Sequence, residues 1–169
     1  ADLGEDYALL QKRLEIIERK LRLWHRNDEQ SRRLAEIPGV GVVGAALLAM
    51  KVPDPKAFRS GRDFAAWLGL TPKDHSTAGK QRLGVITRAG DETLRSVLVV
   101  GATALLRQVR LGRSHHSRWL ADLLRRKPPK LVAVALANKT ARIAWKLMVS
   151  GESYDRTRVG IAAREAAPA

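Results

Sequence analysis

The sequence predicts a mainly α-helical protein in which a coiled-coil arm precedes a compact helical domain with a helix-hairpin-helix motif and one long, basic, glycine-rich loop. Apolar residues recur every three or four positions through most of the chain, as on one face of a helix. Proline and glycine separate the periodic segments. Only residues 69–90 lack a helical period. We therefore divide the chain into an arm (1–36), a domain (37–150) and a flexible tail (151–169).

The arm is predicted to be one long helix over residues 6–34. Its apolar residues alternate by four and three, which is the seam of a coiled coil. The seam consists of Leu10, Leu14, Ile17, Leu21 and Trp24. Residues 1–36 hold 8 basic and 8 acidic side chains, and this neutrality favours a partner helix over nucleic acid. A homo-oligomer formed through the arm and an antiparallel hairpin remain alternatives.

The domain opens with a tight turn, Pro38-Gly39-Val40-Gly41, between two helices. This pattern matches a helix-hairpin-helix motif. Gly39 and Gly41 permit the sharp turn and leave backbone amides exposed at the start of the next helix, where they can bind phosphate without reading bases. A simple tight turn without ligand is the alternative. Small residues follow at 44–46 and 49 and allow close helix packing.

Next, Ser60 is expected to cap a helix over residues 61–68, in which Trp67 serves packing. Residues 69–90 then form a basic loop with a small hairpin. Three helices complete the domain, and they are expected over residues 91–109, from Ser114 or Ser117 to 127, and over 130–149. Their expected inward residues are Leu94, Val97, Leu98, Gly101 and Leu105, then Trp119, Leu120 and Leu123, then Val134, Ala137, Ala141, Trp145 and Met148. Lys139, Arg142 and Lys146 form a basic stripe on the last helix.

Charge indicates the partner. The net charge is +14, and all of this excess lies after residue 36. Lysine and arginine release counterions when they neutralise phosphates, so a nucleic acid is the expected partner; a generically basic protein is the alternative. No apolar run approaches the roughly 20 residues of a membrane span, so no membrane is expected. Without cysteine, disulfides and thiolate metal sites are excluded. The lack of cysteine and of an apolar leader favours an intracellular protein, and with a nucleic-acid partner we expect it in the bacterial cytoplasm, associated with the nucleoid.

Catalytic candidates are few. The four histidines and the dispersed carboxylates after residue 36 form no metal-ligand pattern, so no cofactor is expected within this chain. Ser76 stands in the basic loop, where a hydroxyl can attack a phosphodiester if cations stabilise the developing charge. Lys80, Arg82 and Arg88 could do this. From the chemistry alone, a serine that forms a turn or contacts phosphate is the more common case.

Four sequence segments favour the catalytic interpretation of Ser76 over the more common one. They are Ile37-Pro-Gly-Val-Gly41, Phe64-Ala-Ala-Trp-Leu-Gly-Leu-Thr-Pro72, Ser76-Thr-Ala-Gly-Lys80 continuing to Ile86-Thr-Arg-Ala-Gly90, and Ala135-Leu-Ala-Asn-Lys-Thr-Ala-Arg142. In order and spacing they resemble the C-terminal transposase domain of insertion-sequence transposases related to the pilin-gene invertase, which a bridge RNA guides. The resemblance covers residues 34–150.

This resemblance implies that Ser76 is a nucleophile that forms a transient phosphoserine link to DNA. Thr77 stands where many relatives carry a second serine. It also implies a guide RNA and an N-terminal RuvC-like domain whose four acidic residues bind Mg²⁺. The chain lacks that domain, so we expect it to be inactive alone. Further nucleic-acid contacts are expected from Lys80, Arg82, Arg88, Arg95, Lys139 and Arg142.

Three hypotheses follow. The first is a DNA transposase or site-specific recombinase fragment that binds nucleic acid and supplies Ser76 for strand cleavage and transfer. The second is a non-catalytic helix-hairpin-helix module that grips phosphates through the Gly39–Gly41 turn. The third is a scaffold protein with an incidental basic face.

Overall fold

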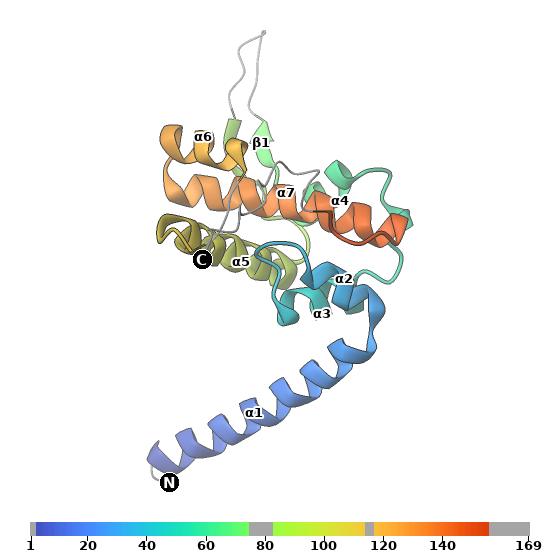
Figure 1. The fold of residues 1–169 in the computed structure, drawn as a ribbon, viewed down its shortest axis with the longest axis vertical. Helices are drawn as coiled ribbons and strands as arrows, with labels where there is room; N and C mark the ends of the chain where they lie inside the picture. Colours follow the sequence, from blue (N-terminus) through green and yellow to red (C-terminus); the bar gives the residue numbers. More distant parts are fainter. Residues whose placement is uncertain (1–2, 75–82, 114–116, 156–169) are drawn as a thin grey trace, which may run out of the picture.

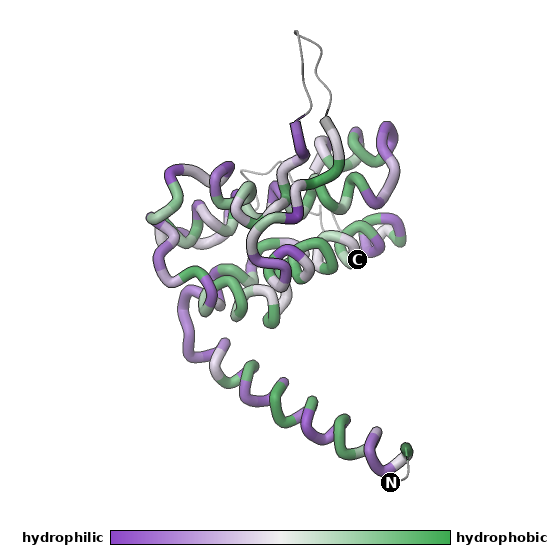
Figure 2. The backbone as a smooth tube through the Cα atoms, turned by 180° about the vertical axis from the view of Figure 1, so that it is seen from behind, coloured by the Kyte–Doolittle hydropathy of each residue, from purple (hydrophilic) through white to green (hydrophobic). Residues whose placement is uncertain are grey.

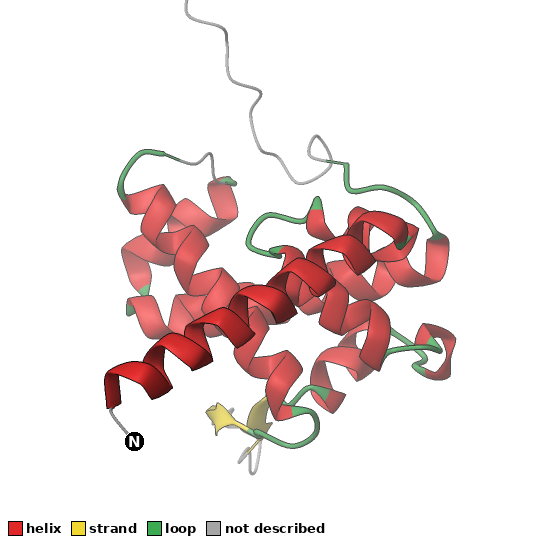
Figure 3. Cartoon of the chain, turned by 90° about the horizontal axis from the view of Figure 1, so that it is seen from below, coloured by secondary structure: helices red, strands yellow, loops and turns green. Residues whose placement is uncertain are grey.

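A helical domain with a projecting N-terminal arm makes up the part of the chain that the structure, a computed structural model, describes: residues 3–74, 83–113 and 117–155. The mainly α-helical class is confirmed (Figure 1). Helix dominates except for a short hairpin at one edge of the domain (Figure 3). The elements are α1 (Leu3–Asn27), α2 (Glu29–Ala35), α3 (Val42–Lys51), the 3-10 turn η1 (Pro55–Ala57), α4 (Gly61–Trp67), β1 (Pro72–Asp74), β2 (Leu83–Ile86), α5 (Glu92–Arg110), α6 (Arg118–Arg126) and α7 (Pro129–Ser150).

The arm is shorter than predicted. A single helix through residue 34 is wrong, because the chain turns extended at Asp28 (φ −98°, ψ 113°) and a new helix begins. The Asp28 carboxylate accepts a hydrogen bond from Ser31 N at 2.6 Å and so caps α2. His25 Nδ1 shares a 2.7 Å hydrogen bond with the buried Ser31 hydroxyl and braces the same junction. Aspartate is a favourable N-cap residue and has a low propensity for the interior of a helix.

α1 contacts α3 and extends away from the domain, with apolar and polar residues alternating along it (Figure 2). It buries none of its residues, and both Leu10 and Ile17 are 62% exposed. An amphipathic helix of this kind leaves its apolar stripe uncovered. A coiled-coil partner for this stripe remains a prediction.

The α2–α3 turn lies where the sequence placed it and rests on α5. Gly39 has a left-handed φ of +85°. A Cβ atom added to Gly101 would stand 1.9 Å from the carbonyl oxygen of Gly39, so the two backbones are in direct contact. One turn along α3, the buried Gly44 packs beside Val97. Small residues thus let α3 approach α5 closely, as expected.

The core surrounds α7, which packs against α5 on one side and α4 on the other. Ala137, Ala141 and Ala144 on α7 are fully buried, and such short side chains allow neighbouring helices to come close. The predicted inward faces are partly wrong. α5 buries Ala102 and Leu106 in addition to the predicted Leu94 and Leu98, whereas Gly101 and Leu105 are only half-buried, with Gly101 against Gly39 and Leu105 against the core. On α7 the buried residues are Val132, Ala133, Leu136, Ala137, Thr140, Ala141, Ala144 and Leu147.

Helix starts follow the sequence closely. Ser60, Asp91 and Ser117 each accept a hydrogen bond from the backbone three residues later and cap α4, α5 and α6. Trp119 is wrongly predicted to face inward, since it is 38% exposed while its neighbour Leu120 is buried. Within the described residues, no helix is both long and apolar enough to cross a bilayer.

The predicted hairpin is confirmed, with β1 antiparallel to β2 and Pro72 opposite Ile86. The first five residues of the tail also have defined positions. Gly151 ends α7 in a left-handed conformation, and its carbonyl accepts a hydrogen bond from Arg33. Tyr154 N donates to Glu36 Oε2 at 3.0 Å. Residues 151–155 therefore lie against the end of α2.

Candidate nucleic-acid interface

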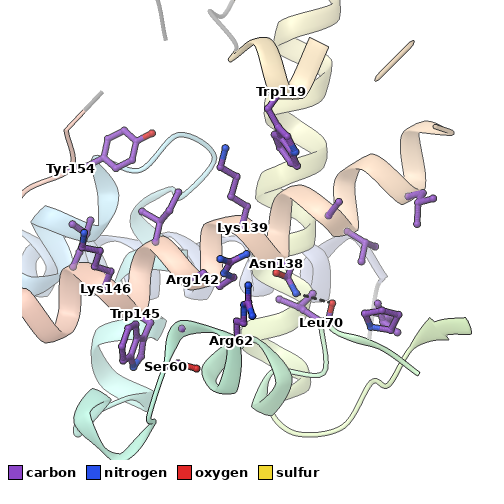
Figure 4. Close-up of a pocket in the computed structure, with 18 of the residues that line it drawn as sticks. Ser60, Arg62, Leu70, Trp119, Asn138, Lys139, Arg142, Trp145, Lys146 and Tyr154 are labelled. Carbon is purple, nitrogen blue, oxygen red and sulfur yellow. Dashed lines mark hydrogen bonds between the residues drawn. The ribbon is translucent and has the colours of Figure 1, made fainter. Parts of the chain in front are cut away.

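A groove of about 1600 Å³ runs along the outward side of α7 (Figure 4). Its walls come from four other parts of the chain: the β1–β2 hairpin, the start of α4, Trp119 on α6 and residues 152–155. We call it the α7 groove. Elements far apart in sequence thus converge on one surface.

Packing at the start of α4 sets one wall. A Cβ atom on Gly61 would lie 3.2 Å from both the Cα and the carbonyl oxygen of Arg142, so the glycine lets α4 begin close to α7 without a tight contact. Trp145 Nε1 donates to the Pro55 carbonyl at 2.9 Å and ties α7 to η1. On the other wall, Asn138 Nδ2 donates to the Leu70 carbonyl at 3.1 Å. These contacts fix both flanks of the groove to α7.

The groove is strongly cationic. Six basic side chains line it: Arg62, Arg88, Lys130, Lys139, Arg142 and Lys146. The acidic lining residues are Glu152 and Asp155, both from the segment after α7. Clustered like charges raise the local potential for a counterion. The lining is therefore suited to a polyanion.

Lys139 lies deepest in this cluster. Its Nζ sits 4.4 Å from the centroid of the Trp119 ring, in a cation–π arrangement. Burial lowers the pKa of Lys139 from its usual range, and the charge of Arg142 lowers it further. Both effects disfavour the free ammonium. An anion in the groove would relieve them.

The structure brings three of the predicted contact residues together. Arg88, Lys139 and Arg142 all line the α7 groove. Arg88 adopts a left-handed φ of 58°, uncommon for a residue other than glycine, and its N–H donates to the Gly69 carbonyl at 3.2 Å. Lys146, the third residue of the predicted basic stripe, also lines the groove.

Arg95 has a different environment. It lies outside the groove lining, and its Nη1 donates to the carbonyls of Leu68 at 3.1 Å and Ala89 at 3.0 Å. These carbonyls directly precede Gly69 and Gly90, two glycines with positive φ that flank the hairpin. The structure thus gives Arg95 a bracing position. Ser76, Lys80 and Arg82 lie outside the described residues.

Gly39 and Gly41 lie apart from the α7 groove, at the start of α3. Gly41 is exposed, its N-cap position has no side-chain hydrogen bond, and an added Cβ would meet nothing within 4 Å. The first amides of α3 are therefore not capped by a side chain. Gly39, in contrast, is packed against α5.

Sequence reasoning missed Arg62, Lys130, Trp119 and Asn138 as lining residues. Lys130 carried a usable signal, because its place at the start of α7 puts it on the same helix as the basic stripe. Arg62 and Trp119 carried none, since α4 and α6 reach the groove only through the tertiary fold. Among the described residues, no three histidine or carboxylate side chains gather to hold a metal ion.

The sequence of this chain is similar to those of known transposases. Residues 31–117 match the model of the "Transposase IS116/IS110/IS902 family". The chain is 72% identical over 152 residues to a putative transposase, y4pF/y4sB, of Sinorhizobium fredii, 44% identical to a probable family 20 transposase of Pseudomonas aeruginosa, and 39% identical to the transposase for insertion sequence element IS1328 of Yersinia enterocolitica. These matches cover 89%, 90% and 91% of this chain but 39%, 45% and 46% of the relatives. The chain thus spans less than half the length of these relatives.

Proposed function

Because the chain belongs to the IS116/IS110/IS902 family of transposases, we propose that it binds DNA and supplies Ser76 as the nucleophile for strand cleavage and transfer. It acts as one part of a longer transposase. The single observation that carries the binding half of this proposal is the α7 groove, in which six basic side chains converge. Nucleic acid is the polyanion on which a transposase acts.

Binding through this groove is mainly electrostatic. Each lysine or arginine that meets a phosphate releases condensed counterions, so affinity falls steeply with salt. Lys139 and Arg142 are neighbours on α7, and Arg88 approaches from the hairpin. Contacts to the backbone position the nucleic acid without reading its sequence. A guide RNA paired to the target would supply that reading.

The chemical half of the proposal concerns Ser76, which lies outside the described residues. Ser76 follows Asp74, the last residue of β1, by two positions, and two peptide units span at most about 7 Å. Pro72 of the same strand lines the groove. Ser76 is thus four positions along the chain from a residue that lines the groove.

In the proposed step, the Ser76 hydroxyl loses its proton to a base and its oxygen forms a bond to the phosphorus of a DNA phosphodiester. The bond between that phosphorus and the leaving-strand oxygen breaks, and that oxygen takes up a proton. The product is a phosphoserine link, which a strand hydroxyl can attack in the reverse sense. Basic side chains stabilise the charge that develops on the phosphoryl oxygens.

Metal chemistry is assigned to another part of the protein. The resemblance implies an N-terminal RuvC-like domain whose acidic residues bind Mg²⁺, which would polarise the reacting phosphate. The described residues of this chain offer no matching carboxylate cluster.

The arm is proposed to assemble the protein. The exposed apolar stripe of α1, which includes Leu10, Leu14 and Ile17, fits pairing with the same helix of another copy. Assembly would place two or more Ser76 hydroxyls on paired strands. A nucleoid-associated, cytoplasmic location follows from this proposed function.

A second candidate function is a non-catalytic module that grips phosphates through the α2–α3 turn. The observation that favours it is the start of α3, where Gly41 is exposed and no side chain caps the helix. Free amides at a helix start bind phosphate readily. This candidate makes Ser76 dispensable.

Trapping of a covalent adduct tests the proposal. The full-length transposase is incubated with Mg²⁺, guide RNA and nicked DNA, and protein–DNA bands that survive denaturation are sought. We expect an adduct in the wild type and in Thr77→Ala, but none in Ser76→Ala, which keeps its affinity for DNA. A Ser76→Ala protein that recombines as well as the wild type would leave the chain a binding module.

A further inference from the structure

The geometry points to a binding site for an unpaired stretch of polynucleotide in the α7 groove, with one base stacked on Trp119. This inference rests on the proposed function, because it assumes that the groove binds nucleic acid. It adds the class of ligand: a single strand with accessible bases rather than a closed duplex.

The position of Trp119 is the first step. On α6 the side chain that is buried is Leu120, whereas Trp119 is 38% exposed and lines the groove. In Figure 4 its ring hangs from α6 over the α7 side chains. Lys139 Nζ, 4.4 Å from the ring centroid, holds the indole at this place. An indole kept exposed in a cationic groove offers a flat surface on which a base can stack.

A second tryptophan in the same chain provides the contrast. Trp67 is also 38% exposed, yet it does not line the groove. Its ring stacks on Phe64 with centroids 5.8 Å apart and lies 5.3 Å from Phe58. Trp67 is therefore part of an aromatic cluster, whereas Trp119 is paired with a cation at the groove.

The mixed lining is the second step. Besides its cations, the groove is lined by apolar side chains, of which Val85 is 68% and Leu131 53% exposed. A duplex presents phosphates and hides the faces of its bases. An unpaired strand presents both phosphates and bases, which match a lining of cations and apolar groups. Six basic residues against two acidic ones complete the charge match.

Fluorescence anisotropy with labelled oligonucleotides of equal length tests this inference on the 169-residue chain. The probes are single-stranded DNA, single-stranded RNA, duplex DNA and a single strand of abasic sites. We expect both base-bearing single strands to bind more tightly than duplex, and the ratio of the DNA and RNA affinities to show which of them the groove prefers.

Trp119→Leu should weaken binding of the base-bearing strands by about tenfold, within the range for stacking one base on an aromatic ring. It should affect the abasic strand and the salt dependence much less, because the substitution removes no charged side chain. Trp119→Phe should keep most of the affinity. Trp67→Leu is the matched control, since it removes an equally exposed indole away from the groove.

Three outcomes decide the matter. Loss of affinity in Trp119→Leu alone, specific to bases, supports the inference. Equal affinity of Trp119→Leu and the wild type, or tighter binding of duplex, overturns it. If Arg142→Glu still weakens binding by about tenfold in that case, the proposed function of the groove stands without a base site. No binding of any probe at low salt would overturn both.

Discussion

The carbonyl oxygen of Gly39 lies so close to Gly101 that a Cβ atom on Gly101 would be 1.9 Å from it. This contact joins the α2–α3 turn directly to the middle of α5. The sequence marked Gly39 as a phosphate-binding residue and Gly101 as one member of an apolar face. In the structure a side chain at Gly101 would enter the backbone of Gly39, and one at Gly39 would be strained by the positive φ and lie 3.1 Å from the Gly101 carbonyl oxygen.

We therefore expect Gly101→Ala to lower the free energy of unfolding by about 2 kcal/mol, in the range for overpacked sites. The added methyl group would have to displace backbone rather than a flexible side chain. Urea unfolding followed by circular dichroism measures this. Gly41→Ser is the control, because its Cβ would meet nothing within 4 Å and its φ of −82° is open to any residue. Equal stability of the two variants would contradict the contact.

The start of α5 should confer a measurable dependence on pH. Asp91 accepts a hydrogen bond from Lys51 Nζ at 2.8 Å and another from Leu94 N at 2.8 Å. The hydrogen bond from Lys51, followed by that from Leu94, lowers the pKa of Asp91 below its usual 3.8. A depressed folded-state pKa stabilises the protein above that usual value, and the contribution is lost as pH falls through the lower pKa.

At pH 7, Asp91→Asn should be less stable than the wild type by about 1 kcal/mol. Between pH 4 and pH 2 the wild type should lose this contribution, whereas Asp91→Asn has no carboxylate at this site to protonate. The measurement is the free energy of unfolding of both proteins across that range. The difference between them should close as the pH falls. A constant difference at all pH values would show that the Asp91 carboxylate does not stabilise the fold through its charge.

Arg95 should act on stability rather than on binding. Its two hydrogen bonds to the Leu68 and Ala89 carbonyls hold the base of the hairpin. Hydrogen bonds from a charged donor contribute about 1.5–3 kcal/mol, so Arg95→Met should lower the unfolding free energy by about that amount. The slope of log affinity for DNA against log salt should stay as in the wild type. A slope shallower by about one would instead make Arg95 a phosphate contact.

Local chemistry made much of the fold predictable. Ser60 and Asp91 each precede a segment with helical apolar spacing, and each can cap a helix with its own side chain. The starts of α4 and α5 can therefore be predicted from the local sequence. Asp28 caps α2 in the same way, but the apolar spacing predicted one unbroken helix through it to residue 34. The choice between cap and interior depends on Ser31, which is buried only in the folded domain.

The α7 groove could be predicted from the sequence only in part. Lys139 and Arg142 are three positions apart on one helix, so their common face follows from the sequence. Arg62 and Trp119 reach the same groove from α4 and α6, and only the packing of these helices on α7 brings them there. The face of α7 was partly mispredicted for a related reason. A helix packed on two sides buries more than one stripe, and a single period cannot describe it.

Charge reversal in the groove should weaken nucleic-acid binding without harming the fold. Arg142→Glu removes one phosphate contact and adds repulsion, so we expect affinity to fall by about tenfold and the salt slope to become shallower by about one. Filter binding at several salt concentrations measures both. Arg107→Glu is the matched control, because Arg107 is an exposed arginine on α5 outside the groove lining, and the net charge changes equally. Equal losses in both variants would indicate an effect of net charge alone.

A carboxylate at the start of α3 separates the two candidate functions. Gly41 is exposed at the N-cap position with open space around it, so Gly41→Asp can cap the first-turn amides and should leave stability unchanged or raise it by a few tenths of a kcal/mol. If those amides bind phosphate, the new carboxylate occupies and repels that site, and DNA affinity falls severalfold. If the α7 groove carries binding, affinity changes little, because Gly41 does not line it. We expect the second result, and a loss in Gly41→Asp as large as that in Arg142→Glu would favour the non-catalytic module.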